Sequence, residues 1–255
     1  MLSYYLISAP GDRKENEDAA GAVAWANGGI FVLADGLGGH GGGALASRCV
    51  VERLLRLPPP RQESELSSNL TRALQDAHSA LLQLQHAHSL RVGGKSTAAV
   101  AVVLSEHLCI GHVGDSRVYI FGKRKLLRRT LDHSVPQILA LAGQIREKDI
   151  RHHPDRNHLL RALGGGDVPL EIDIFSCTTQ EIKALLLCSD GFWELINERQ
   201  MEAALRRADT PQDWLRHMET IVLRNGRNYS MDNYSAIGIY LYEKLKRKQN
   251  KRSLP

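Results

Sequence analysis

Short apolar runs rich in Val, Ile and Tyr recur along this chain, and some are joined by links of only a few residues. Asn27-Gly28-Gly29 and Gly122-Lys123 are links of this kind, and both are typical of hairpin turns. Strands joined by so short a link must run antiparallel, because a parallel pair needs a longer crossover. The runs that we interpret as strands are Ala22–Ala26, Ile30–Ala34, Thr97–Leu104, Leu108–Val113, Arg117–Phe121, Ala184–Cys188 and Ala236–Tyr242, with Met1–Ile7 as a further one.

Segments with leucine and alanine at intervals of three and four residues predict helices. These helices are Ala44–Leu57, Leu66–Leu90, Glu198–Arg207 and Pro211–Leu223. The prolines that follow Leu57 end the first helix, and Thr210 is the N-cap of the last. Antiparallel strands combined with long amphipathic helices predict an α+β sandwich in which helices cover the outer faces of sheets.

The charge of the chain argues against a nucleic-acid-binding domain. The net charge is +5, but residues 243–255 hold six Lys or Arg and one Glu, which leaves 27 basic and 27 acidic residues in the rest of the chain. A polyanion-binding domain would carry its positive charge on the folded surface. We therefore expect a single neutral domain, residues 1–243, followed by a basic tail, residues 244–255, and no nucleic-acid partner.

Nothing in the sequence predicts export or membrane insertion. The first residues have neither a basic segment nor a long apolar segment of the kind that a signal peptide has. No apolar run approaches the roughly 18 residues that suggest a membrane span. Cys49, Cys109, Cys177 and Cys188 lack C-x-x-C spacing and are interpreted as reduced core thiols. A cytoplasmic location is the prediction.

The most informative local pattern is an apolar strand that ends in Asp followed at once by Gly. It occurs at Asp35-Gly36 and at Asp190-Gly191, and Asp115 follows a related strand. One Asp-Gly pair is ordinary turn chemistry. Three carboxylates at the ends of apolar strands are costly to desolvate unless they are paired or bind a metal. Oxygen ligands suit Mg²⁺ or Mn²⁺ better than zinc or copper, and a glycine leaves its own carbonyl open to a ligand.

Two further acidic segments, Gly11–Asp18 and Met231–Ser235, complete a series of seven motifs. In order they are Arg13…Asn16-Glu17-Asp18, Asp35-Gly36-Leu37-Gly38-Gly39-His40, Gly114-Asp115-Ser116-Arg117, Asp132-His133-Ser134, Arg161-Ala162-Leu163-Gly164, Ser189-Asp190-Gly191 and Asp232-Asn233. This order and spacing, from Gly11 to about Tyr242, resembles the PPM or type-2C family of metal-dependent serine/threonine phosphatases. The short length and the D-G-x-G-G-H motif are similar to its stand-alone bacterial branch.

The resemblance implies a four-layer αββα sandwich, with two antiparallel sheets flanked by helices. It also implies two divalent metal ions, Mn²⁺ or Mg²⁺, as cofactors. Asp35 would bridge both ions, and the carbonyl of Gly36 would bind one of them. Asp190 and Asp232 would hold the second.

The other implied residues act beside these ligands. Glu17 and Asp18 would act mainly through metal-bound water. Asp115, with Asp190, would hold a third ion of the kind that bacterial relatives often bind; a structural Asp in a turn is the alternative. Arg13 would grip the substrate phosphate, because its planar fork matches phosphate oxygens. A hydroxide activated by the two metals would attack phosphorus, so no cysteine or serine nucleophile is needed.

Three features depart from the family pattern or imitate another. Many eukaryotic relatives have a histidine where this chain has Leu37, so the acid that protonates the leaving oxygen is His40 or a metal-bound water; a structural role for His40 is the alternative. Gly94-Lys95-Ser96-Thr97 imitates a nucleotide-binding loop, but it precedes a strand rather than a helix. The charged stretch Ala142–Asn157 is interpreted as a flap that contacts substrate.

The predicted function is therefore hydrolysis of phosphoserine and phosphothreonine on proteins. The expected partners are phosphoproteins modified by a bacterial Ser/Thr kinase, and the enzyme is expected to be a monomer. A catalytically silent phosphoprotein-binding module on the same fold and a two-metal hydrolase of small phosphate esters remain alternatives. Pseudoenzymes lose metal carboxylates first, whereas Asp35, Asp190 and Asp232 are all present.

Overall fold

Two antiparallel sheets face each other in the computed structural model, which describes residues 2–38, 42–87, 94–123, 125–166 and 169–242. In order, the strands of the first sheet are β1 (Leu2–Ala9), β11 (Tyr234–Leu241), β10 (Ala184–Cys188), β7 (Arg117–Phe121) and β8 (Leu126–Arg129). Those of the second are β2 (Asp18–Trp25), β3 (Gly28–Leu37), β5 (Ala98–Leu104), β6 (His107–Val113) and β9 (Asp173–Thr178), and β4 (Lys95–Ser96) pairs with the end of β3.

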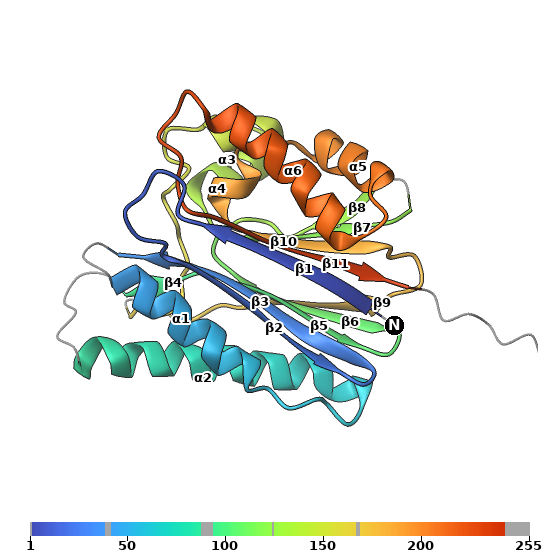
Figure 1. Cartoon of the computed structure of the whole chain (residues 1–255). Coiled ribbons are helices and arrows are strands. Elements are labelled where there is room, and N and C mark those ends of the chain that lie inside the picture. Colours follow the sequence, from blue (N-terminus) through green and yellow to red (C-terminus); the bar gives the residue numbers. More distant parts are fainter. Residues whose placement is uncertain (1, 39–41, 88–93, 124, 167–168, 243–255) are drawn as a thin grey trace, which may run out of the picture.

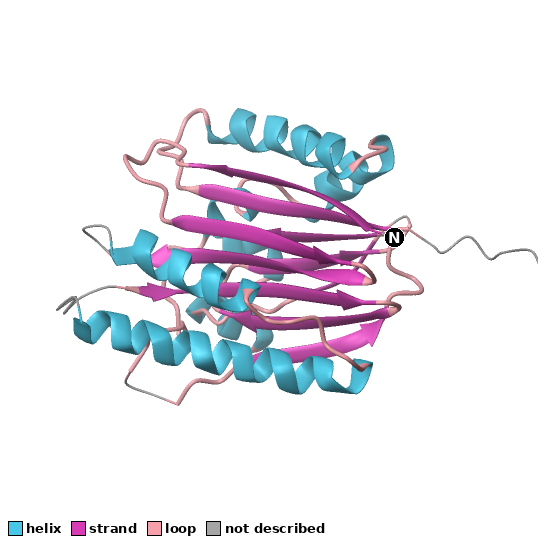
Figure 2. Ribbon diagram, turned by 60° about the horizontal axis from the view of Figure 1, so that its bottom comes forward, coloured by secondary structure: helices cyan, strands magenta, loops and turns pink. Residues whose placement is uncertain are grey.

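Helices form the two outer layers (Figure 1 and Figure 2). The second sheet is covered by α1 (Gly42–Leu55) and α2 (Leu66–Ala87). The first sheet is covered by α4 (Asp190–Trp193), α5 (Glu198–Arg207) and α6 (Pro211–Gly226), with α3 (Val135–Leu141) on the same side. Short 3-10 helices span Glu63–Glu65 and Glu147–His152. The predicted four-layer αββα sandwich is confirmed.

Burial on both faces explains why the central strands are apolar throughout rather than alternating. Successive side chains of a strand point to opposite faces. Along β10, Leu185 and Leu187 pack between the sheets, whereas Leu186 packs against the helices of the first sheet. Along β5, Ala101 lies between the sheets and Val102 lies toward α1 and α2. A strand covered on both sides has no polar face to display.

Several predicted boundaries were wrong by a few residues. β2 begins at Asp18 instead of Ala22, because Asp18 pairs with Asp35 in the β2–β3 ladder. β3 continues to Leu37 instead of ending at Ala34, because its last residues pair with β4. Asp35 therefore lies within a strand. β8, β9 and α3 were not predicted, and the predicted helix residues 88–90 lie outside the described residues.

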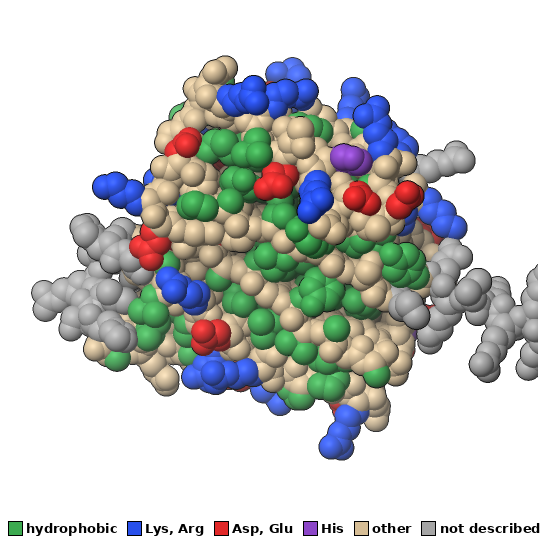
Figure 3. Space-filling model, in the orientation of Figure 1, with side chains coloured by type: hydrophobic (Ala, Val, Ile, Leu, Met, Phe, Trp, Pro, Cys, Tyr) green, Lys and Arg blue, Asp and Glu red, His purple; other side chains and the backbone are tan. Residues whose placement is uncertain are grey.

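The edge strands β1 and β2 lie side by side on one side of the sandwich (Figure 1). Hydrophobic side chains gather on this face in Figure 3, and Tyr4 of β1 and Val23 of β2 are partly exposed. Within the described part of the chain, none of the helices combines the length and apolar character that crossing a membrane requires.

Candidate metal centre

A cleft of about 610 Å³ contains most of the predicted site residues. Its lining residues are Arg13, Lys14, Glu15, Glu17, Asp35, Gly36, Leu37, Gly38, Asp115, Asn157, Leu159, Asp190, Asp232 and Asn233. Asp18 lies buried behind it, on the strand that pairs with β3. His40 lies outside the described residues.

Both sheets supply acidic residues to the cleft. Asp35 is carried by β3 of the second sheet, and Asp115 follows β6 of the same sheet. Asp190 begins α4 directly after β10 of the first sheet, and Asp232 precedes β11. Residues that are nearly 200 positions apart in the chain therefore meet where the ends of the two sheets face each other.

The glycines of the two Asp-Gly pairs are required by close packing of the backbone. A Cβ atom on Gly36 would clash with the carbonyl oxygen of Gly43, at the start of α1. A Cβ atom on Gly191 would clash with the carbonyl oxygen of Asn233. These contacts bring Asp190 next to Asp232 and bring Asp35 next to the first turn of α1. The sequence interpretation, that glycine keeps a carbonyl open to a ligand, missed this packing role.

Burial and mutual repulsion raise the pKa values of four carboxyl groups in and beside the cleft, those of Asp18, Asp35, Asp115 and Asp190. Burial first, and then the neighbouring carboxylates, hold the pKa of Asp35 well above its usual range. Burial and Asp190 do the same for Asp115, and burial and Asp232 raise the pKa of Asp190. The pKa of Asp18 rises to about 7, chiefly through burial. Such a group of acids is stable in its charged form only when positive charge is placed among them.

The acidic residues fit hard divalent cations. The Oδ1 atom of Asp18 is buried with no hydrogen-bond partner in the described structure, while its Oδ2 atom accepts a hydrogen bond of 2.7 Å from the Ser189 hydroxyl. The donors that face the cleft are carboxylate and carbonyl oxygens, which Mg²⁺ and Mn²⁺ prefer. An orphaned buried oxygen beside several carboxylates is the arrangement expected of a cation site.

Arg13 lies at the mouth of the cleft and contacts Asp232. Its Nη2 atom donates a hydrogen bond of 2.7 Å to Asp232 Oδ2, and its side chain is 57% exposed. The guanidinium therefore lies against a predicted metal ligand.

Hydrogen bonds to the backbone hold Asp35 in place, and sequence reasoning missed them. The Asp35 amide donates to Thr97 Oγ1 at 2.9 Å, and the Thr97 amide donates to the Asp35 carbonyl at 2.9 Å. The Ser96 hydroxyl donates to the same carbonyl at 3.0 Å. The segment that imitates a nucleotide-binding loop thus supports a metal ligand, and Lys95 is exposed as expected.

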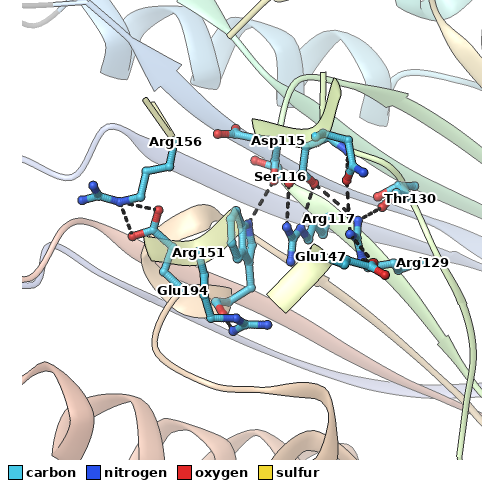
Figure 4. A network of polar contacts seen from close by, with 12 residues as sticks. Asp115, Ser116, Arg117, Arg129, Thr130, Glu147, Arg151, Arg156 and Glu194 are labelled. Atoms are coloured by element: carbon cyan, nitrogen blue, oxygen red, sulfur yellow. Dashed lines mark hydrogen bonds and ion pairs between the residues drawn. The ribbon is translucent and has the colours of Figure 1, made fainter. Parts of the chain in front are cut away.

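Trp193 supports Asp115 in a similar way and was also missed. Its indole nitrogen donates a hydrogen bond of 3.0 Å to the Asp115 carbonyl. The guanidinium of Arg117 stacks on the Trp193 ring at 3.4 Å and forms a buried bidentate ion pair with Asp132. Figure 4 shows Asp115 and Arg117 within this network of polar contacts.

The charged segment 142–157 is bound to the body of the protein by its arginines. Arg151 donates to the carbonyls of Trp193 and Ile196, at 2.6 and 2.7 Å, and Arg156 pairs with Glu194 (Figure 4). Burial first, and then Asp190, raises the pKa of Glu194 to about 7. Both arginines thus form contacts within the protein, and substrate contact by this segment stays a prediction. Asn157 is the residue of this segment that lines the cleft.

Comparisons with known proteins agree with the fold. The family model of protein phosphatase 2C matches residues 11–232. The chain belongs to the protein phosphatase 2C family. The serine/threonine phosphatase stp of Listeria monocytogenes serotype 4b (strain F2365) is 33% identical over 204 residues, which are 78% of this chain and 80% of that protein.

Solved structures of protein phosphatase 2C relatives share the whole fold. Stp1 from Staphylococcus aureus matches with a TM-score of 0.84 at 26% identity, over 95% of this chain and 96% of that one. The catalytic domain of PstP, solved in complex with 2 manganese ions, matches with a TM-score of 0.81 at 26% identity, over 95% and 99%. The family prediction, and with it the prediction of a protein phosphatase, is confirmed.

Proposed function

We propose that the chain hydrolyses phosphoserine and phosphothreonine esters on proteins with the help of two divalent cations, Mn²⁺ or Mg²⁺. The convergence of several carboxylates and one exposed arginine in a single cleft supports this proposal most strongly. The comparisons support it independently. The similar PstP catalytic domain was solved in complex with 2 manganese ions, and the similar Listeria protein is named a serine/threonine phosphatase.

Asp35, Asp190 and Asp232, together with the Gly36 carbonyl, would hold the two ions. When bound, the ions supply Lewis acidity and a solvent nucleophile near neutral pH. Glu17, which lines the cleft, and Asp18, whose Oδ2 atom is held by the Ser189 hydroxyl, would act mainly through metal-bound water.

Arg13 binds the phosphoryl group in this proposal. Its guanidinium is exposed at the mouth of the cleft, permanently charged, and able to donate two parallel hydrogen bonds to phosphate oxygens. It would stabilise the negative charge that spreads over those oxygens as the ester bond breaks. Asp115, with Asp190, would hold a third ion, and His40 or solvent would protonate the leaving oxygen.

We also infer the cellular setting from the relatives. Several of them are bacterial serine/threonine phosphatases, so the proposed substrates are proteins phosphorylated by a bacterial Ser/Thr kinase. The proposed enzyme is a cytoplasmic monomer with one domain, residues 1–243, and a basic tail, residues 244–255.

The experiment compares phosphopeptide hydrolysis with hydrolysis of a nucleoside monophosphate, in added Mn²⁺, in added Mg²⁺ and in excess EDTA. We expect turnover of the phosphopeptide with either ion and none with EDTA. Asp35→Asn and Asp190→Asn should each abolish turnover, because each removes charge that holds a cation, while circular dichroism shows a folded protein. Full turnover in EDTA would falsify the metal requirement, and near-normal rates in either variant would exclude that residue as a ligand.

A further inference from the structure

A second group of potential metal ligands lies outside the acidic cleft. His112 is the residue before the end of β6, His133 follows β8, and Asp173 begins β9. One donor atom from each lies within 4.8 Å of the other two, and His133 Nε2 is 3.3 Å from Asp173 Oδ2. His112 and Asp173 are partners across the β6–β9 ladder, so the backbone itself holds two of the three side chains together.

The hydrogen bonds of His112 leave a ligand atom free. Its Nε2 atom is 2.9 Å from the Ser116 carbonyl, which can only accept, so Nε2 carries the proton. Nδ1 is then an unprotonated nitrogen, buried and without a hydrogen-bond partner in the described structure. Metal-binding histidines usually donate their other N–H to a carbonyl or carboxylate in this way. Burial lowers the pKa of His112 to about 4, so the ring stays neutral, as a ligand must be.

A cleft leads from the surface to this group. It has a volume of about 520 Å³, lies between β6, β7, β8 and β9, and is lined by His112 and Asp173. Asp173 is 57% exposed and can move toward a cation. Arg128 and Arg129 also line the cleft, and Arg161 lies 3.9 Å from Asp173, so nearby positive charge should make binding weaker than at a closed structural zinc site.

We propose that His112, His133 and Asp173 bind a borderline-soft divalent cation such as Zn²⁺, distinct from the ions of the acidic cleft. Two imidazole nitrogens and one carboxylate oxygen are the ligands of many zinc sites that keep a fourth position for water. Imidazole favours Zn²⁺ over Mg²⁺, and the order of affinities among the first-row ions places Zn²⁺ above Mn²⁺.

Binding at this site is coupled to the turn that carries Asp115. His133 Nδ1 accepts a hydrogen bond of 3.1 Å from the Gly114 amide, so in the metal-free protein the ring proton is on Nε2. A cation that binds His133 Nε2 displaces this proton to solvent. The neutral ring takes up a proton from solvent on Nδ1 instead. The Gly114 amide loses its acceptor, while the bond from His112 to Ser116 is kept. The turn should loosen on one side of Asp115.

Cobalt absorption tests the binding step without any assay of phosphatase activity. Co²⁺ replaces Zn²⁺ and absorbs visible light strongly in a four-coordinate site with histidine ligands, but weakly among six oxygens. We would titrate Co²⁺ into the full chain with excess Mg²⁺ present to occupy the acidic cleft. The expected result is a strong visible band that Zn²⁺ abolishes. Absence of this band in the wild-type protein overturns the proposal.

Matched variants identify the ligands. Asp173→Asn should weaken Co²⁺ binding about tenfold or more. Glu171→Gln is the control, because Glu171 is also exposed and pairs with Arg161 but is not part of the group. Asp35→Asn should leave the band unchanged. A band that is lost in Asp35→Asn and kept in Asp173→Asn would place Co²⁺ in the acidic cleft and overturn the proposal.

Inhibition by Zn²⁺ tests the coupling, and this step alone rests on the proposed phosphatase function. With Mn²⁺ at saturation, the Zn²⁺ concentration for half-inhibition should rise about tenfold in Asp173→Asn and stay unchanged in Glu171→Gln, with equal rates before Zn²⁺ is added. Suppose that the cobalt titration detects the site but the two variants are equally sensitive to Zn²⁺. The coupling to the Asp115 turn is then wrong, while the binding site itself stands.

Discussion

At the scale of single residues, Asp190 and Asp232 are held in the same way. The Gly191 amide donates to Asp190 Oδ1 at 2.6 Å, and the Asn233 amide donates to Asp232 Oδ1 at 2.8 Å. One oxygen of each carboxylate is thus fixed by the next residue of the backbone, and the other can face a cation. In this structure Asp232 Oδ2 is paired with Arg13, so the proposed phosphate-binding residue and a proposed metal ligand are in direct contact.

Replacement of Arg13 separates phosphate binding from metal binding. Arg13→Ala should lower kcat/KM for a phosphopeptide about ten- to hundred-fold, because a charge-assisted contact of roughly 1.5–3 kcal/mol is lost. Arg13→Lys should restore part of this, since a point charge cannot reproduce the bidentate fork. Mn²⁺ affinity, measured by calorimetry, should stay close to wild type. Lost Mn²⁺ binding with an unchanged KM would mean that Arg13 supports the metal site instead.

The titration of Asp18 should appear in the stability of the metal-free protein. Burial raises the pKa of Asp18 to about 7, well above the value of about 3.9 in an unfolded chain. A raised pKa in the folded state stabilises the fold at low pH, and this contribution is lost as the pH rises through about 7. In EDTA, the melting temperature should therefore fall between about pH 4 and pH 7.

Asp18→Asn should flatten this part of the pH profile, because the amide does not titrate and can still accept the hydrogen bond from Ser189. Asp76→Asn, at an exposed position on α2, is the control and should keep the wild-type slope. A wild-type slope in Asp18→Asn as well would show that other groups cause the pH dependence.

At the scale of elements, the sequence predicted best the strands and helices whose apolar residues are buried along the whole element. β7, β10 and α5 have the predicted boundaries, because the apolar run of each strand, and the apolar face of the helix, coincide with the residues that are buried. β8 and β9 were missed because they lie at sheet edges and are only partly buried. The Asp-Gly pattern located acidic residues, but the supporting bonds from Thr97 and Trp193 are long-range contacts that no local pattern reveals.

The segment that follows α3 offers an element-scale prediction. Arg151 is only 12% exposed on its side chain, and it bonds two carbonyls between α4 and α5 as well as Glu198. Arg151→Met should lower the free energy of unfolding by about 1–3 kcal/mol, because buried acceptors lose their donor. It should also increase amide hydrogen exchange across residues 142–157, which lose their attachment to the body.

Arg146→Met is the matched control for this experiment. Arg146 lies in the same segment, is 72% exposed and pairs with Asp149 within that segment. Its replacement should change neither stability nor exchange noticeably, since exposed ion pairs contribute little. Equal effects in the two variants would mean that Arg151 does not anchor the segment.

At the scale of the whole molecule, the cleft exists only because the two sheets pack face to face. Asp35 and Asp115 come from one sheet, and Asp190 and Asp232 come from the other. The family resemblance predicted that these residues meet, whereas apolar periodicity alone left the strand order open. His112, His133 and Asp173 show the same limit more sharply, since their spacing in the sequence carries no metal-binding pattern, and three separate elements bring them together.

The surplus positive charge of the chain lies in its last residues, which are outside the described part of the structure. The surplus of +5 is contained in residues 243–255, and the last strand, β11, is complete at Leu241, where it pairs with Leu2 of β1. All strand, core and cleft-lining residues in the described part of the chain lie before residue 243, so deletion of residues 244–255 leaves every one of them in place. The body that remains is close to neutral, so its attraction for a phosphopeptide depends on Arg13 and on the bound cations rather than on the tail.

We expect the shortened protein to hydrolyse a phosphopeptide with kcat and KM within about twofold of the full chain, at low and at moderate ionic strength, since screening acts only on charges that contribute to binding. The assay should use one neutral and one acidic phosphopeptide. If the tail attracts acidic substrates, KM for the acidic peptide will rise on deletion and the difference will vanish as salt is added. A fall in kcat for both peptides would instead show that the tail reaches the catalytic cleft or supports the fold, and thermal denaturation of the shortened protein would separate these two causes.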